Sequence, residues 1–176
     1  MSSKRLACLF LTALGLIGIH SVPLIGQEQC LTDAWNAKKS GNHDAAIRAA
    51  VECINSFASE AKNTEDGLKN KPVIKPGRLS APDRTKALDQ GLLNDVAAAY
   101  IVKGEAAEVL AKNNAANADL QQSYNKLAID AYEAALVYRH ALVSDGRSPE
   151  SFWSPCIAAA NHLKNLTKAD HSQVCY

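Results

Sequence analysis

Apolar residues recur along most of the chain at the spacing of three and four positions that is typical of an amphipathic α-helix. Residues 28–40 predict a first helix, which Gly41 ends. Asn42 is expected to cap a second helix, whose apolar face consists of Ala46, Ile47, Ala50, Val51, Ile54 and Phe57. No stretch shows the convincing alternation of apolar and polar positions that indicates a strand. The pattern therefore predicts an all-α fold.

The helical pattern stops between residues 59 and 80. Gly67, Pro72, Pro76 and Gly77 interrupt a polar run there, so a long solvated connection is expected. After it, Ser80 is expected to cap a short helix that ends near residue 90.

Three longer helical segments are expected in the second half of the chain. One follows Gly91, and the polar residues 113–118 end it. Asn117 is expected to cap the next segment, whose buried face is predicted to hold Leu120, Tyr124, Leu127, Ala131, Ala135, Tyr138 and Leu142. Ser154 caps the last segment, with Pro155 at the first helical position, where a missing N–H has no cost.

The first 26 residues differ from the rest. Lys4 and Arg5 precede an apolar run from residue 6 to residue 19, as in a secretory signal peptide. We expect residues 1–26 to be removed and Gln27 to begin a single mature domain of residues 27–176. The alternative is an uncleaved membrane anchor, since residues 6–26 have roughly the length that spans a bilayer.

Charge excludes one class of partner. Without the leader the chain has 17 Lys and Arg against 18 Asp and Glu. No basic stripe remains, so the electrostatic pattern of a nucleic-acid binder is missing. No stable membrane anchor is expected after leader removal.

Four cysteines lie in the mature chain, an even number that predicts two disulfides in an exported protein. Metal binding is the alternative, but there is no C-x-x-C spacing. In a hairpin that turns at Gly41, Cys30 and Cys53 are equally far from the turn and face each other. Cys156 begins the last helix, and the tail is long enough to return Cys175 to it. We therefore predict the pairs Cys30–Cys53 and Cys156–Cys175.

Two segments carry a repeated pattern. Ala128-Ile129-x-x-Tyr132-x-x-Ala135-Leu136 has the A-x-x-x-F-x-x-A-L spacing of a tetratricopeptide repeat, and Ala46-Ile47-x-x-Ala50-x-x-Cys53-Ile54 has it with smaller residues. The chain thus resembles tetratricopeptide-repeat proteins, and specifically exported, bacterial ones. The resemblance implies two antiparallel helix hairpins and a terminal capping helix in a short right-handed solenoid.

The resemblance is partial. A regular array repeats at about 34 residues, whereas Ala46 and Ala128 are more than twice that far apart. It covers two divergent units and a closing helix, and the alternative is a generic helical bundle.

The leading helices of such hairpins line one concave surface. This places the candidate binding residues on that surface: Trp35, Lys38, Lys39, Ile101, Glu105 and Glu108. Trp35 is alternatively a core residue, and Phe152 with Trp153 is expected to form a hydrophobic staple onto the last helix.

The sequence contains none of the common catalytic and cofactor motifs GxGxxG, the P-loop, HExxH and GxSxG. We therefore expect no enzyme activity, no cofactor and no metal. The sequence favours a non-enzymatic protein- or peptide-binding or scaffold module that is secreted or periplasmic. The alternative function is a cell-envelope or polysaccharide-associated accessory factor, with aromatic residues stacked on sugars.

Overall fold

The computed structural model describes residues 27–176, so the leader predicted at 1–26 lies outside the described residues. The helices are α1 (Gln27–Lys39), α2 (His43–Leu68), α3 (Ala81–Leu88), α4 (Gly91–Asn113), α5 (Ala118–Ala135), α6 (Pro155–Thr167) and the short 3₁₀ helix η1 (Ser172–Cys175). The prediction of an all-α fold is confirmed.

Helix starts follow the predicted capping residues. In each case the side-chain oxygen accepts a hydrogen bond from the backbone N–H three positions on, and the four caps are Asn42, Ser80, Asn117 and Ser154. Gly41 has a φ of 79°, the left-handed conformation that favours glycine, and it turns the chain from α1 into α2.

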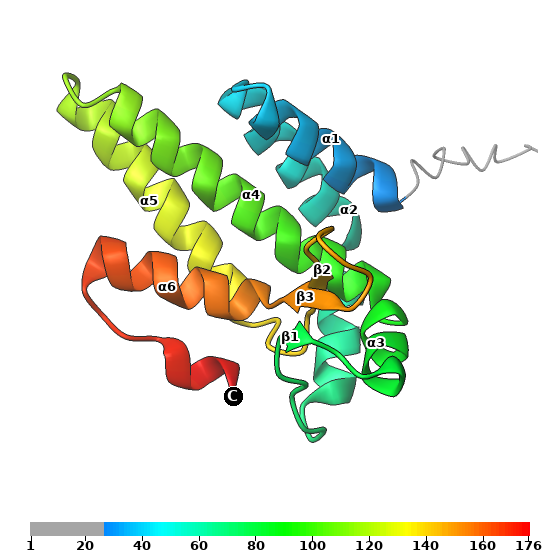
Figure 1. Ribbon diagram of the computed structural model, residues 1–176. Coiled ribbons are helices and arrows are strands. Elements are labelled where there is room, and N and C mark those ends of the chain that lie inside the picture. The colour runs from blue at the N-terminus through cyan, green and yellow to red at the C-terminus, as the bar shows by residue number, and fades with distance from the viewer. Residues whose placement is uncertain (1–26) are drawn as a thin grey trace, which may run out of the picture.

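Helix α4 is the centre of the molecule. It packs against α2 and α5, and its ends and outer side also contact α1 and α6, which lie on either side of it (Figure 1). It carries more buried residues than any other described helix. Even so, no helix within residues 27–176 combines the length and apolar character needed to cross a membrane.

Gly104 allows α4 and α5 to approach closely. A Cβ atom at Gly104 would lie 2.5 Å from the ring of Tyr132, which is fully buried on α5. Small residues such as Ala107 and Ala128 continue this contact in the same apolar cluster. Gly104 therefore lies at a close crossing of these two helices.

The connection expected at residues 59–80 starts later than predicted. Helix α2 continues to Leu68, so the connection begins at Lys69. Ala61 and Glu65 carry the buried face of α2 onward. Glu65 is buried because His140 pairs with it, and a pattern of apolar residues does not reveal a buried carboxylate of this kind.

Three short strands were not predicted. They are β1 (Gly77–Arg78), β2 (Val143–Ser144) and β3 (Ser151–Trp153), in the antiparallel order β1-β3-β2. Strands of two or three residues are too short to show a period of two. Phe152 packs in this sheet region with Leu79 and Leu142, so the staple onto α6 is wrong for Phe152. Trp153, the other predicted staple residue, packs against the cluster that contains Ala159 and Leu163 of α6.

Helix α5 is shorter than expected. It ends at Ala135, and the chain reaches Leu142 without helical structure, although Tyr138 and Leu142 are buried as predicted. Leu120, predicted on the buried face, is 43% exposed because it lies in the first turn of α5.

Both predicted cysteine pairs are joined. Cys30 and Cys53 connect α1 to α2 with a Cα–Cα distance of 5.3 Å, and Cys156 and Cys175 connect α6 to η1 at 5.7 Å. Both distances lie in the normal range for disulfides.

Candidate functional site

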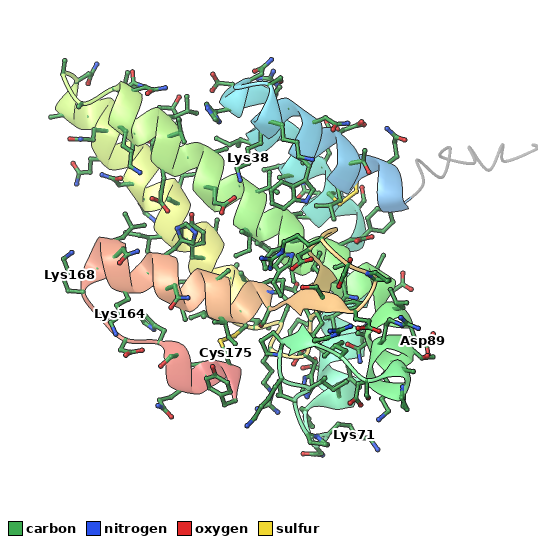
Figure 2. All side chains as sticks on the ribbon, viewed as in Figure 1. Lys38, Lys71, Asp89, Lys164, Lys168 and Cys175 are labelled. Carbon is green, nitrogen blue, oxygen red and sulfur yellow. A yellow bond between two sulfur atoms is a disulfide. The ribbon has the colours of Figure 1, made fainter. Side chains whose placement is uncertain are left out.

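The candidate site is a polar cluster on the outer side of α4, where α1 and α6 flank it. We define the cluster as Lys38, Glu105, Glu108, Tyr132 and His162. Its members come from four helices and from positions as far apart as 38 and 162, so packing against α4 brings them together. Figure 2 shows Lys38 beside α4, reaching across from α1.

The α1 side of the cluster is an ion pair above an aromatic ring. Lys38 donates from its ammonium group to the Glu105 carboxylate, and both side chains are about three-quarters buried. The same ammonium lies 4.7 Å from the centre of the Trp35 ring, within cation–π range. Trp35 thus holds Lys38 in place while packing against the core beneath.

The α6 side of the cluster is a histidine between two carboxylates. Nδ1 of His162 lies 2.6 Å from Oε1 of Glu108, and its Nε2 lies 3.5 Å from Oε1 of Glu105. The imidazole also stacks on the Tyr132 ring, with the ring centres 4.5 Å apart. The Tyr132 hydroxyl donates to Glu108 at 2.7 Å, which ties α5 into the same network.

These contacts shift the pKa values of three side chains in the cluster. The interaction with Glu105 raises the pKa of His162, and the attraction of Glu108 adds to it and outweighs the opposing effect of burial. Burial would raise the pKa of Glu105, but His162 and Lys38 hold that pKa below its usual value. Burial and the bond to Glu108 raise the pKa of Tyr132, so the phenol stays protonated and donates.

Four of the six predicted site residues gather here: Trp35, Lys38, Glu105 and Glu108. Lys39 is exposed on α1 without a contact to the cluster. The prediction for Ile101 is wrong, because its side chain is only 1% exposed and packs inward among residues of α5 and α6. Ile101 and Glu105 are one helical turn apart and therefore on the same side of α4, but residues of α5 and α6 cover α4 at the level of Ile101.

His162 was not predicted as a site residue. A single histidine has no partner at a fixed spacing, and its role depends on where α6 packs against α4. Tyr132 was identified only as part of the repeat pattern. Its ring is fully buried, and the contact of its hydroxyl with Glu108 depends on the packing of α5 against α4.

The geometry of the cluster suits holding charged side chains in fixed positions at the surface, where a partner could contact them. Among the described residues, no Ser, Thr or Cys side chain is hydrogen-bonded to His162, so it has no nucleophile to activate there. Within residues 27–176, no group of three or more His, Cys, Asp or Glu side chains is arranged to hold a metal ion.

Comparisons with protein-family models, curated proteins and solved structures return no match for this chain.

Proposed function

We propose that the protein is an exported, non-enzymatic binding module that holds a peptide segment of a partner protein. The observation that carries this proposal is the gathering of Trp35, Lys38, Glu105, Glu108 and His162 on the face that α1, α4 and α6 share. We name this surface the leading-helix face.

The packing scheme supports a repeat-like arrangement. Helices α1 and α2 form one antiparallel pair and α4 and α5 form the next, and α4 also packs on α2 while α6 packs on α5. The central leading helix α4 thus contacts its own partner α5, the previous hairpin of α1 and α2, and the next helix α6. Stacked hairpins of tetratricopeptide type have this scheme, and their leading helices present a binding surface.

The two disulfides support export. They join Cys30 to Cys53 and Cys156 to Cys175, and such bonds persist in oxidising compartments. The apolar leader agrees with this placement in the periplasm or outside the cell.

The charge of the leading-helix face favours an acidic segment. Glu105 and Glu108 are already engaged by Lys38, His162 and Tyr132. The remaining exposed charges include the Lys112 ammonium, 75% exposed at 3.7 Å from Glu108, and the exposed Lys39. Lys38, Lys39 and Lys112 thus outnumber Glu105 and Glu108 on this face, and partner carboxylates would meet a positive surface.

The aromatic residues give less support to the polysaccharide alternative. Trp35 and Trp153 are both half-buried and pack against the same core cluster. A sugar-stacking platform needs an exposed ring face, and neither ring is among the exposed large apolar side chains of the described region.

Site-specific photo-crosslinking in the host tests the proposal. A crosslinking amino acid at Lys39 on α1 or at Asn161 on α6 samples the leading-helix face, and one at Lys126 on α5 samples a different surface. We expect a discrete adduct from the first two positions and none from the third, with an acidic partner peptide in the mass spectrum. No adduct, or equal adducts from all three positions, contradicts the proposal.

Charge-reversal variants distinguish binding at the leading-helix face from an effect of the protein's overall charge. Lys39→Glu with Lys112→Glu should reduce the adduct at Asn161 at least about tenfold, because like charges then oppose the partner. Lys126→Glu is the matched control on α5 and should leave the adduct unchanged.

A further inference from the structure

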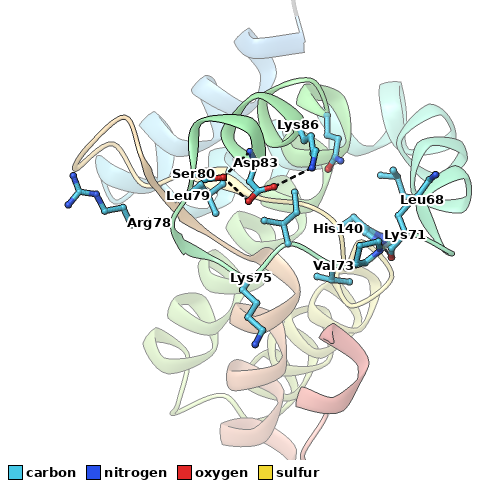
Figure 3. A pocket seen from close by; sticks show the side chains of 13 residues that line it. Leu68, Lys71, Val73, Lys75, Arg78, Leu79, Ser80, Asp83, Lys86 and His140 are labelled. Atoms are coloured by element: carbon cyan, nitrogen blue, oxygen red, sulfur yellow. Dashed lines mark hydrogen bonds and ion pairs between the residues drawn. The ribbon is translucent and has the colours of Figure 1, made fainter.

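A second site lies away from the leading-helix face. A cavity of about 680 Å³ opens between the end of α2, the connection 69–80 and α3 (Figure 3). This volume falls in the range of small-molecule sites. None of the residues that line it belongs to the polar cluster.

The walls of the cavity combine apolar and cationic side chains. Leu68, Val73, Ile74 and Leu79 supply the apolar part. Among the charged lining residues, four are cationic and only Asp83 is acidic. Asp83 accepts from the Ser80 hydroxyl at 2.8 Å and lies 3.3 Å from the Lys86 ammonium, so its charge is already used.

The positive charge of the cavity is only partly neutralised. Arg78 pairs with Glu150, and in Figure 3 its guanidinium points away from the cavity. Lys71 and Lys75 form no ion pair with a described residue. Both are exposed at the rim, where a flexible ammonium turns toward an anion at small cost.

The connection also offers backbone donors. Between Pro72 and Pro76, the N–H groups of Val73, Ile74 and Lys75 donate no backbone hydrogen bond to any described residue. Backbone N–H groups that lack an internal partner are available to an anion or to water.

Gln90 places an unsatisfied hydrogen-bonding group beside the cavity. It lines the cavity, and its side-chain oxygen is buried without a hydrogen-bond partner among the described residues. An unsatisfied buried polar atom is destabilising. A ligand hydroxyl satisfies it, and because a hydroxyl both donates and accepts, it fits either orientation of the amide.

His140 is not available to a ligand, although it lines the cavity. Its Nδ1 lies 2.6 Å from Oε1 of Glu65, and its Nε2 lies 3.1 Å from the backbone oxygen of Lys71. The bond between His140 and the Lys71 backbone fixes the start of the connection, and hence one side of the cavity.

We infer that this cavity binds a small hydroxylated organic anion. Its carboxylate is held by Lys71, Lys75 and the backbone N–H groups of the connection, its hydroxyl bonds Gln90, and its body contacts the apolar wall. This site is additional to the proposed peptide-binding function and does not depend on it.

Three six-membered-ring compounds serve as probes. One has both the negative charge and the hydroxyl groups of the inferred ligand, and each of the other two lacks one of these features. Glucuronate has the charge and the hydroxyls, glucose lacks the charge, and cyclohexanecarboxylate lacks the hydroxyls. Titration calorimetry on the purified protein should show saturable binding of glucuronate, with the other two weaker by at least about tenfold. Equal binding of all three, or no saturable binding of glucuronate, overturns the inference.

Two variants locate the binding. Lys71→Gln with Lys75→Gln should weaken glucuronate binding at least about tenfold, and Gln90→Leu should reduce glucuronate to the level of cyclohexanecarboxylate. The matched control is Lys62→Gln with Lys126→Gln, which removes two exposed lysines that do not line the cavity and should change nothing. Equal losses in the control and the cavity variant overturn the inference.

The two proposals can be contradicted independently of each other. If glucuronate does not bind while the photo-crosslinks form at Lys39, only the cavity inference is lost. If glucuronate binds and no crosslink forms, only the peptide-binding proposal is lost.

Discussion

At the scale of single residues, the position of His162 between Glu105 and Glu108 makes stability depend on pH. Its pKa is raised in the folded protein above the unfolded value of about 6.5. The stabilisation is therefore complete below about pH 6.5 and is lost as the pH rises through the folded value. We expect His162→Gln to cost more free energy of unfolding at pH 6 than at pH 9, measured by urea denaturation.

The difference between wild type and variant cancels the other titrating groups. His171→Gln is the matched control for removing an imidazole, because that side chain forms no ion pair with a carboxylate among the described residues. A His162→Gln difference that stays constant from pH 6 to pH 9 contradicts the prediction.

Gly104 gives a second residue-scale prediction. A methyl group there would meet the Tyr132 ring at 2.5 Å, and both helices are fixed by the core. We expect Gly104→Ala to lower the free energy of unfolding by about 1–3 kcal/mol, as overpacking does. Thermal or urea denaturation measures the change.

Gly67 in α2 is the matched control. Nothing lies within 4 Å of a Cβ added there, and its φ is not positive. Alanine has the higher helix propensity, so Gly67→Ala should leave stability unchanged or raise it by up to about 1 kcal/mol. If both substitutions stabilise the protein, the prediction that α4 and α5 approach too closely for a methyl group at Gly104 is contradicted.

At the scale of elements, each disulfide fixes one end of the chain. Cys30 and Cys53 are 23 residues apart, and their bond holds α1 against α2. Replacing both with alanine should cost about 3 kcal/mol of unfolding free energy. Hydrogen–deuterium exchange should speed up chiefly in α1.

The second bridge supplies the control for that experiment. Replacing Cys156 and Cys175 with alanine should release η1 and leave exchange in α1 unchanged, because η1 packs on α6. Faster exchange in α1 after this second replacement would show that the two ends are coupled and would contradict the assignment of each bridge to one element.

Helix starts could be predicted from the sequence more reliably than helix ends. An N-cap such as Asn42 or Ser154 is a local side-chain contact, so its residue type is informative. The end of α2 depends on Glu65, which is buried against His140 and also pairs with Arg139. The end of α5 and the three short strands depend in the same way on contacts distant in sequence.

At the scale of the whole molecule, the sequence predicted most of the polar cluster but not its connections. Lys38 and Glu105 were placed on leading helices by the repeat pattern, which is a local property. Their partner His162 became part of the site through the packing of α6 on α4. The same dependence misplaced Ile101, since its burial is set by α5 and α6.

The buried pair of Glu65 and His140 connects three distant parts of the molecule. Both side chains are at least 94% buried. Glu65 accepts from the backbone N–H of His140 as well as from its ring, and His140 in turn bonds the backbone of Lys71. The end of α2, the segment after α5 and the connection that borders the cavity are thus held together by one polar network, to which Arg139 adds a bond to the backbone of Lys69 and an ion pair with Glu65.

Removing one member of this pair should be costly. Glu65→Leu leaves the imidazole and the backbone N–H of His140 buried without their acceptor, and we expect a loss of about 1–3 kcal/mol in the free energy of unfolding. Glu65→Leu with His140→Leu replaces both by apolar groups, and the double variant should recover much of that loss. A double-mutant cycle by urea denaturation measures the coupling, which should exceed about 1 kcal/mol. Additive losses in the double variant would show that the two side chains stabilise the fold independently.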